Sequence, residues 1–142
     1  MMRVVPDVNV IISAIIAPLG TPRQVLNAWQ AQRFTAITSE GIIAQVEEKL
    51  HYPRIGQAYG ITEDDIRWVG GLLRTQAKVV VVPPGALAEV VDDPEDDYVL
   101  ATGIVGEADY LVTGDRELLA LREHQGMKIV SPRAFLEISN RG

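Results

Sequence analysis

Cysteine is absent from the 142-residue sequence, and histidine occurs only twice. Disulfide bonds and thiolate metal sites are therefore excluded, which fits a reducing compartment. Long apolar runs are also lacking: the longest near the start, VIISAIIA, is far shorter than the roughly 20 residues that a transmembrane helix needs. We therefore expect a soluble, cytoplasmic protein with no membrane segment.

Basic residues are scarce as well, because 13 Lys and Arg face 19 Asp and Glu, for a formal net charge of −6. Nucleic-acid-binding proteins usually carry a basic face, so the overall balance argues mildly against that class. It does not exclude an enzyme whose acids are concentrated in a metal site. The location of the acids therefore matters more than their sum.

Apolar residues, counting alanine and the aromatic ones, make up 47% of the sequence. Short β-branched runs, typical of strands, alternate along the chain with segments in which apolar residues recur at helical spacing. We expect one domain over residues 1–142. Strands are predicted at 2–7, 34–38, 78–82, 109–113 and 127–131, and helices at 8–17, 22–32, 39–51, 63–76, 98–106, 115–123 and 132–139. With no two-residue hairpin signal recognised, this order predicts a three-layer α/β domain with a mainly parallel central sheet and helices on both faces.

Acidic residues follow three of the predicted strands. Asp7 comes after RVVP, Asp115 comes after YLVTG, and the segment DDPEDD (92–97) lies in the loop after KVVVV. Sites in open α/β sheets lie outside the carboxyl ends of the strands. We therefore expect these acids to meet at one edge of the sheet.

Each acid also has a structural explanation, since aspartate is a preferred N-cap residue worth about 1 kcal/mol. Capping explains Asp115 about as well as a functional role does. The same holds for any one of Asp93, Asp96 and Asp97. Asp7 is harder to explain in this way, because its neighbours are apolar. Carboxylates held close together repel one another unless a cation neutralises them. Oxygen ligands alone suit Mg²⁺ or Mn²⁺, so the grouping predicts a divalent-metal site.

Such a site suits a metal-dependent phosphodiesterase, because a bound divalent ion can activate water and neutralise charge on a scissile phosphate. His51 and His124 are left out of the ligand set. Each is placed at the C-terminal end of a predicted helix, where a histidine near the helix dipole is unremarkable.

The motifs resemble those of the PIN domain family over nearly the whole chain. VVPDVNVIISAI is similar to the opening of the family, DDPEDDYVLATG to its central aspartate box, ADYLVTGDRELLAL to its third block and IVSPRAFLE to its ending. The combination is similar to the bacterial branch of VapC-type toxins. The resemblance implies a PIN-like fold and an Mg²⁺- or Mn²⁺-dependent endoribonuclease, with an RNA substrate, an antitoxin protein and a homodimer as partners.

The resemblance also implies roles for individual residues. The catalytic, metal-binding acids would be Asp7, Asp96 and Asp115, with Asp93 and Asp97 competing for the position of Asp96. The polar residues that would support the carboxylates or their waters are Asn9, Ser13, Gln45 and Thr113.

One position departs from the family pattern. The family usually has a glutamate six residues beyond the serine that ends the second strand, and counting from Ser39 gives Gln45. An amide oxygen can still bind a metal or a water, but it carries no charge, so we expect weaker metal binding. Helical spacing places Glu48 about 60° from Gln45, where it could substitute only if the helix rotates.

Two other functions stay open. DVNV and TGD also resemble the haloacid-dehalogenase phosphatases, but Asn9 stands where those enzymes need a second acid, and the chain is short for that fold. The other alternative is a PIN scaffold that binds RNA or an antitoxin without cutting. Gln45 and the net charge of −6 favour that alternative.

Overall fold

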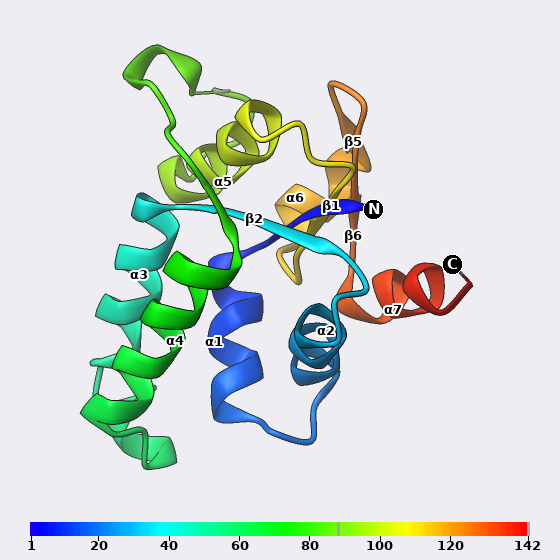
Figure 1. Ribbon diagram of the computed structural model, residues 1–142. Helices are drawn as coiled ribbons and strands as arrows, with labels where there is room; N and C mark the ends of the chain where they lie inside the picture. Colours follow the sequence, from blue (N-terminus) through cyan, green and yellow to red (C-terminus); the bar gives the residue numbers. More distant parts are fainter. Residues whose placement is uncertain (88, 142) are drawn as a thin grey trace.

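A central sheet organises the computed structural model, which describes residues 1–87 and 89–141 (Figure 1). Within these residues the strand order is β3-β2-β1-β4-β6-β5. Every neighbouring pair is parallel except β5 and β6. The strands are β1 (Arg3–Pro6), β2 (Thr35–Ser39), β3 (Lys78–Val80), β4 (Tyr110–Val112), β5 (Glu123–His124) and β6 (Met127–Val130).

Helices occupy the connections between most of these strands, and a last helix follows β6. They are α1 (Val8–Ile16), α2 (Thr21–Gln30), α3 (Glu40–Leu50), α4 (Glu63–Gln76), α5 (Pro94–Val105), α6 (Arg116–Leu121) and α7 (Pro132–Arg141), with two short 3₁₀ turns, η1 (Gln57–Tyr59) and η2 (Pro84–Ala86). In Figure 1, α5 lies above β1 and β2, and α1 to α4 lie below them. The predicted α/β class, with a mainly parallel sheet between two helical layers, is confirmed.

The two central strands form the middle of the core. Val4 and Val5 on β1, and Leu111 and Val112 on β4, are fully buried because helices cover both faces of the sheet. Val5 is in register with Leu111, so β1 and β4 end at the same edge. The residues that follow these two strands are therefore neighbours, although they are far apart in the sequence.

A glycine lies where the side chain of Tyr98 on α5 meets α3. A Cβ atom built on Gly41, in the first turn of α3, would lie 2.5 Å from the phenol ring of Tyr98 on α5. A larger residue at position 41 would displace that ring, so the glycine lets the Tyr98 side chain pack against the first turn of α3.

The C-terminal hairpin was not predicted. The predicted helix 115–123 ends at Leu121, because Arg122 adopts a positive φ of 61°. The chain then forms β5, and Gln125 (φ 49°) and Gly126 (φ 87°) make the two-residue turn into β6, a conformation typical of type I′ hairpins. His124 therefore lies in a strand, not at a helix end.

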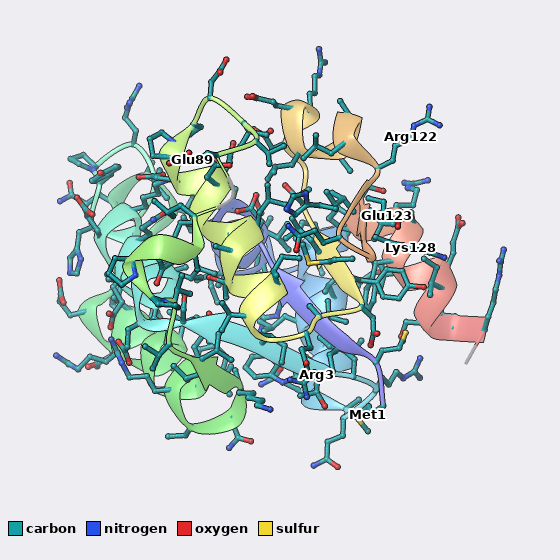
Figure 2. All side chains as sticks on the ribbon, turned by 90° about the horizontal axis from the view of Figure 1, so that it is seen from above. Met1, Arg3, Glu89, Arg122, Glu123 and Lys128 are labelled. Carbon is teal, nitrogen blue, oxygen red and sulfur yellow. The ribbon has the colours of Figure 1, made fainter. Side chains whose placement is uncertain are left out.

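Figure 2 shows the position of this hairpin in the molecule. Arg122, Glu123 and Lys128 lie together on it, on the side opposite Glu89 in the loop before α5. Glu123 pairs in register with Lys128.

Two other boundaries differ from the prediction. Helix α5 begins at Pro94 and not at residue 98, because Asp93 caps it: Oδ1 of Asp93 accepts a 2.9 Å hydrogen bond from the N–H of Glu95. Asp96 and Asp97 therefore lie in the first helical turn and not in a loop. The predicted strand 78–82 ends at Val80, at an exposed edge of the sheet. No helix in the described ranges is long and apolar enough to cross a membrane.

Candidate active site

Asp7 leaves the end of β1 and caps α1. Its backbone N–H donates to the carbonyl of Val112 on β4, at 2.9 Å. Its Oδ1 accepts from the N–H of Val8 at 2.7 Å, and its Oδ2 accepts from the hydroxyl of Thr113 at 2.7 Å. The residue is only 3% exposed, so both carboxylate oxygens are fixed in a buried position.

The environment of Asp7 raises the pKa of its carboxyl. Burial is the largest cause, and the negative charge of Asp115 acts in the same direction. The hydrogen bonds from Thr113 and Val8, and the positive charge of Lys49, lower the pKa and oppose this effect. Ionising the carboxyl of Asp7 in this position therefore costs free energy unless a cation lies nearby.

Thr113 also positions the second acid. Its Oγ1 accepts a 3.0 Å hydrogen bond from the backbone N–H of Asp115, and Thr113 is fully buried. Oδ1 of Asp115 accepts from the N–H of Leu118 at 3.0 Å and caps α6. Its Oδ2 has no hydrogen-bond partner among residues 1–87 and 89–141, so one oxygen of Asp115 stays free for a ligand.

Asp96 reaches the same place from α5. Burial, then Asp115, Asp7, Asp93 and Glu117, raise the pKa of its carboxyl from 3.8 to about 7. Within the part of the chain that the structure describes, no group donates a hydrogen bond to this carboxylate. Asp96 is therefore an unpartnered acid whose nearest charges include the other two candidate acids.

The structure separates Asp96 from its two sequence neighbours. Oδ1 of Asp97 accepts from the backbone N–H groups of Val90 and Val91, at 3.0 and 3.2 Å, and the residue is buried. Asp93 caps α5. Asp97 thus holds the loop before α5, and Asp93 holds the start of the helix. Asp96 makes no such hydrogen bond in the described residues.

Gln45 and Glu48 lie on α3 but differ in exposure. Oε1 of Gln45 is buried, and no donor in the described residues reaches it. Glu48 is exposed, and its carboxylate accepts a long hydrogen bond of 3.4 Å from the hydroxyl of Tyr52. Glu48 therefore does not take the place of Gln45 in the protein interior.

Lys49 is a site residue that the sequence reasoning missed. Its Nζ lies 3.0 Å from Oε2 of Glu95, and its charge lowers the pKa of Asp7. The available signal was its spacing, since residues four apart on a helix share a face and Lys49 follows Gln45 by four. Lysine is not an expected metal ligand, so the search for oxygen ligands passed over it.

Asn9 and Ser13 lie near Asp115, because they line the same cavity. Within the described residues neither side chain makes a hydrogen bond to Asp7, Asp96 or Asp115. Both line a cavity of about 520 Å³. The other residues that line it are Val10, Pro22, Gly114, Asp115, Arg116, Glu117 and Pro132. A groove with mixed apolar and polar lining and one basic side chain, Arg116, therefore opens next to Asp115.

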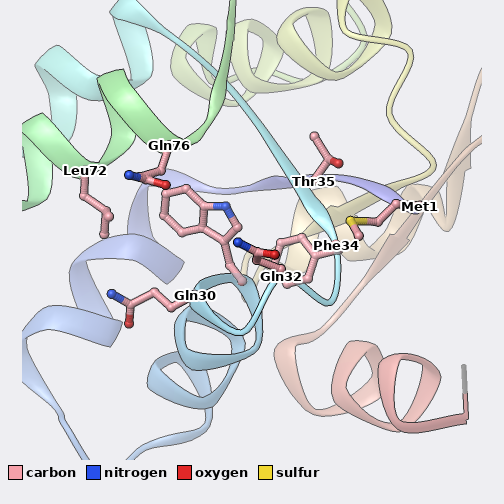
Figure 3. Close-up of a pocket in the computed structure, with 8 residues that line it drawn as sticks. Met1, Gln30, Gln32, Phe34, Thr35, Leu72 and Gln76 are labelled. Carbon is pink, nitrogen blue, oxygen red and sulfur yellow. The ribbon is translucent and has the colours of Figure 1, made fainter.

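A second cavity, of about 440 Å³, lies near the starts of β1 and β2 (Figure 3). Figure 3 shows Gln30, Gln32 and Gln76 around it, with Phe34 and Leu72. Its described lining contains no acidic or basic side chain. It lies at the opposite ends of the strands from the acids and has no group that would act on a phosphate.

The donor atoms of the acidic centre fit a hard divalent cation. They are the carboxylate oxygens of Asp7, Asp96 and Asp115, and oxygen ligands are what Mg²⁺ and Mn²⁺ prefer. Within the described residues no donor reaches the carboxylate of Asp96 or the buried Oε1 of Gln45, and such atoms are what a bound cation or its waters would satisfy. In the described residues no three or more His, Cys, Asp or Glu are already grouped closely enough to hold a metal ion.

The fold agrees with the family comparison. The chain belongs to the PIN domain family, whose model matches residues 3–117. Members of this family are generally nucleases, which is inconsistent with the haloacid-dehalogenase alternative.

One curated relative covers nearly the whole chain. It is the uncharacterized protein MJ1680 of Methanocaldococcus jannaschii, 26% identical over 144 residues, which are 96% of this chain and 90% of that protein. The shared length extends the similarity beyond the residues that the family model matches.

Proposed function

We propose that this protein is an Mg²⁺- or Mn²⁺-dependent endoribonuclease whose centre is formed by Asp7, Asp96 and Asp115. One arrangement carries the proposal: the Thr113 hydroxyl is bonded to Asp7 and to the backbone of Asp115, and the charges of these two acids raise the pKa of Asp96 to about 7. Acids from β1, α5 and the end of β4 therefore act on one another at a single edge of the sheet. Like charges kept together in this way are explained by a cation that binds between them.

Each acid contributes something different to the proposed reaction. Asp7 is fixed by two hydrogen bonds. Within residues 1–87 and 89–141, Asp115 keeps one oxygen and Asp96 keeps both without a donor, so these could bind a metal or its waters. Thr113 orients two of the three acids. A divalent ion held here supplies an activated water and neutralises charge on the RNA phosphate.

The groove beside Asp115 supports a chain-like substrate. Asn9 and Ser13 offer hydrogen-bonding groups, and Arg116 offers a positive charge for a phosphate that flanks the cleaved one. An acidic protein can bind RNA in this way, because the metal and a few local cations replace a general basic face.

The test is cleavage of RNA by the purified protein with Mn²⁺, with Mg²⁺ and with chelator. We expect cleavage of an unstructured RNA in the first two and none with chelator. Asp96→Asn should abolish it, whereas Asp64→Asn, at an exposed acid of α4, should not. Cleavage that persists in chelator, or in the Asp96 variant, would show that another centre or a contaminant is responsible.

We also propose a biological setting: the toxin of a toxin–antitoxin pair in the cytoplasm, acting as a homodimer and inhibited by an antitoxin. The small domain and the order of its motifs support it. Expression from an inducible promoter should arrest growth, and Asp96→Asn should relieve the arrest. Normal growth with active wild-type enzyme in the cells would contradict the toxin role and leave the nuclease role intact.

A second function, a scaffold that binds RNA without cutting, has one observation in its favour. Gln45 gives α3 an uncharged amide at the centre, which lowers the attraction for a cation. Calorimetric titration with Mn²⁺ separates the two functions. The nuclease requires binding that disappears in Asp96→Asn, and the scaffold requires RNA binding that is indifferent to Mn²⁺.

A further inference from the structure

Lys49 brings a positive charge to the acidic centre. Its ammonium is 3.0 Å from the carboxylate of Glu95 in the first turn of α5, and its side chain is only 22% exposed. It is also near enough to Asp7 to lower the pKa of that acid. One cation of the chain is therefore paired with the residue next to Asp96, and its charge also acts on Asp7.

The helix that carries Lys49 gives the centre no negative charge. Gln45 lies one turn earlier, and residues four apart share a helix face. The amide oxygen of Gln45 is buried, without a donor in the described ranges. Glu47 is drawn to the neighbouring helix, where Arg74 binds it at 3.0 and 3.1 Å. Arg74 also binds Glu40, and Glu48 is exposed. The α3 side chain whose charge acts on Asp7 is therefore the positive one of Lys49.

The ion pair with Glu95 does not by itself explain this placement. The Glu95 side chain is 50% exposed, and a pair of this kind contributes little to stability. A lysine ammonium has three N–H donors, and in the described residues Glu95 is its single acceptor. Two donors of Lys49 therefore stay available at the border of the centre.

We propose that Lys49 binds the RNA phosphate that is cleaved, and that Glu95 positions it. This inference rests on the proposed nuclease function. The ammonium would donate a hydrogen bond to a non-bridging oxygen and offset the charge that develops on the phosphate. In two-metal centres a second ion has this task. Because the chain supplies its own cation here, the centre takes one divalent ion per chain.

Lys49→Met tests the proposal, because it removes the charge and keeps most of the aliphatic length. We expect a loss of kcat on the order of 10²-fold, similar to the loss of one charge-stabilising donor in other enzymes. Binding of Mn²⁺, measured by calorimetry, should become tighter, because a repelling cation is gone. Its stoichiometry should be one in wild type and variant.

RNA binding gives a second readout that needs no turnover. We would measure it by anisotropy with a fluorescent single-stranded RNA, in an Asp115→Asn background that keeps the RNA intact. The slope of log affinity against log salt should be less steep by about 0.7 in Lys49→Met, because one fewer phosphate of the single strand is neutralised. Glu95→Gln should keep the slope but lower kcat, because the charge remains and its position is lost.

Lys128→Met is the matched control. Lys128 is exposed on β6, far from the loop before α5 that contains Glu89 (Figure 2). We expect its kcat, salt slope and Mn²⁺ affinity to equal those of the wild type.

Three outcomes would overturn the inference. Wild-type cleavage and an unchanged salt slope in Lys49→Met would remove Lys49 from the site and leave the nuclease proposal standing. Two Mn²⁺ ions per chain would overturn the single-ion centre. A wild-type protein that neither binds Mn²⁺ nor cleaves RNA would overturn the nuclease function itself, and Lys49 with it.

Discussion

The hydroxyl of Thr113 donates a 2.7 Å hydrogen bond to Oδ2 of Asp7, although the two residues are 106 positions apart in the sequence. The same hydroxyl oxygen accepts the N–H of Asp115 at 3.0 Å. One buried neutral group therefore fixes the acid after β1 and the backbone of the acid after β4. It holds them together at the edge where their charges repel.

Thr113→Val should destabilise the protein by about 1–3 kcal/mol, the cost of leaving a buried acceptor and a buried donor without their partner. The valine has nearly the same shape, so the loss measures the hydroxyl and not the packing. Urea unfolding in the presence of chelator would measure the free energy of unfolding without a contribution from metal.

Thr38→Val is the matched control for that substitution. Thr38 is also fully buried, but its hydroxyl has no hydrogen-bond partner in the described residues. The same change should therefore be neutral or stabilising there. Equal losses at both positions would contradict the role given to the Thr113 hydroxyl.

The metal-free protein should lose stability as the pH rises from about 4 to about 7. The pKa of Asp96 is raised from 3.8 to about 7 in the folded protein, so the folded state binds more protons than the unfolded state in this range. Stability then falls with increasing pH. The raised pKa of Asp7 acts in the same direction.

Because other groups titrate in this range, the measurement is the difference between wild type and Asp96→Asn. In thermal unfolding with chelator, the melting temperature of Asp96→Asn should rise relative to that of the wild type as the pH increases from about 4 to about 7. Saturating Mn²⁺ should reverse the order, because only the wild type keeps the full ligand set. A pH-independent difference would mean that Asp96 is not under electrostatic strain.

The fold was predictable from sequence because strands and helices alternate with clear changes of period. The meeting of Asp7 and Asp115 followed from the rule that parallel strands end at one edge of the sheet. The hairpin was missed because its turn is Gln125-Gly126, and a positive φ at a glutamine is uncommon. Propensity alone favoured continuing the helix through Arg122.

The central acids could not be separated from sequence for a different reason. Asp93, Asp96 and Asp97 are chemically identical and nearly adjacent, and only their positions at the N-cap and on the first turn of α5 distinguish them. Those positions are fixed by tertiary contacts, above all by the N–H groups of Val90 and Val91 that bind Asp97. A search for metal ligands did not single out Lys49, because its contact with Glu95 joins residues of two helices that are 46 positions apart in the sequence.

Alanine at the two neighbouring acids should therefore have opposite effects. Asp96→Ala removes an unpartnered, repelled carboxylate, so the metal-free protein should become more stable while Mn²⁺ binding is lost. Asp97→Ala leaves two backbone N–H groups without an acceptor, and should cost about 1–3 kcal/mol but keep Mn²⁺ binding in the folded protein. Calorimetry and urea unfolding on both variants would check this, and a loss of Mn²⁺ binding in the Asp97 variant alone would reverse the assignment.

Gln45→Glu should strengthen metal binding, because it adds a negative charge at a buried oxygen that has no donor. The same charge should lower the stability of the metal-free protein, since it joins carboxylates that already repel. Glu48→Gln is the control: its carboxylate is exposed, so removing that charge should change neither quantity much. Gln45→Glu adds one negative charge to α3, and Glu48→Gln removes one. If only the net charge mattered, Mn²⁺ affinity would rise in the first variant and fall by a similar amount in the second. A change in Mn²⁺ affinity confined to Gln45→Glu, followed by calorimetry at constant ionic strength, would place the amide of Gln45 at the metal.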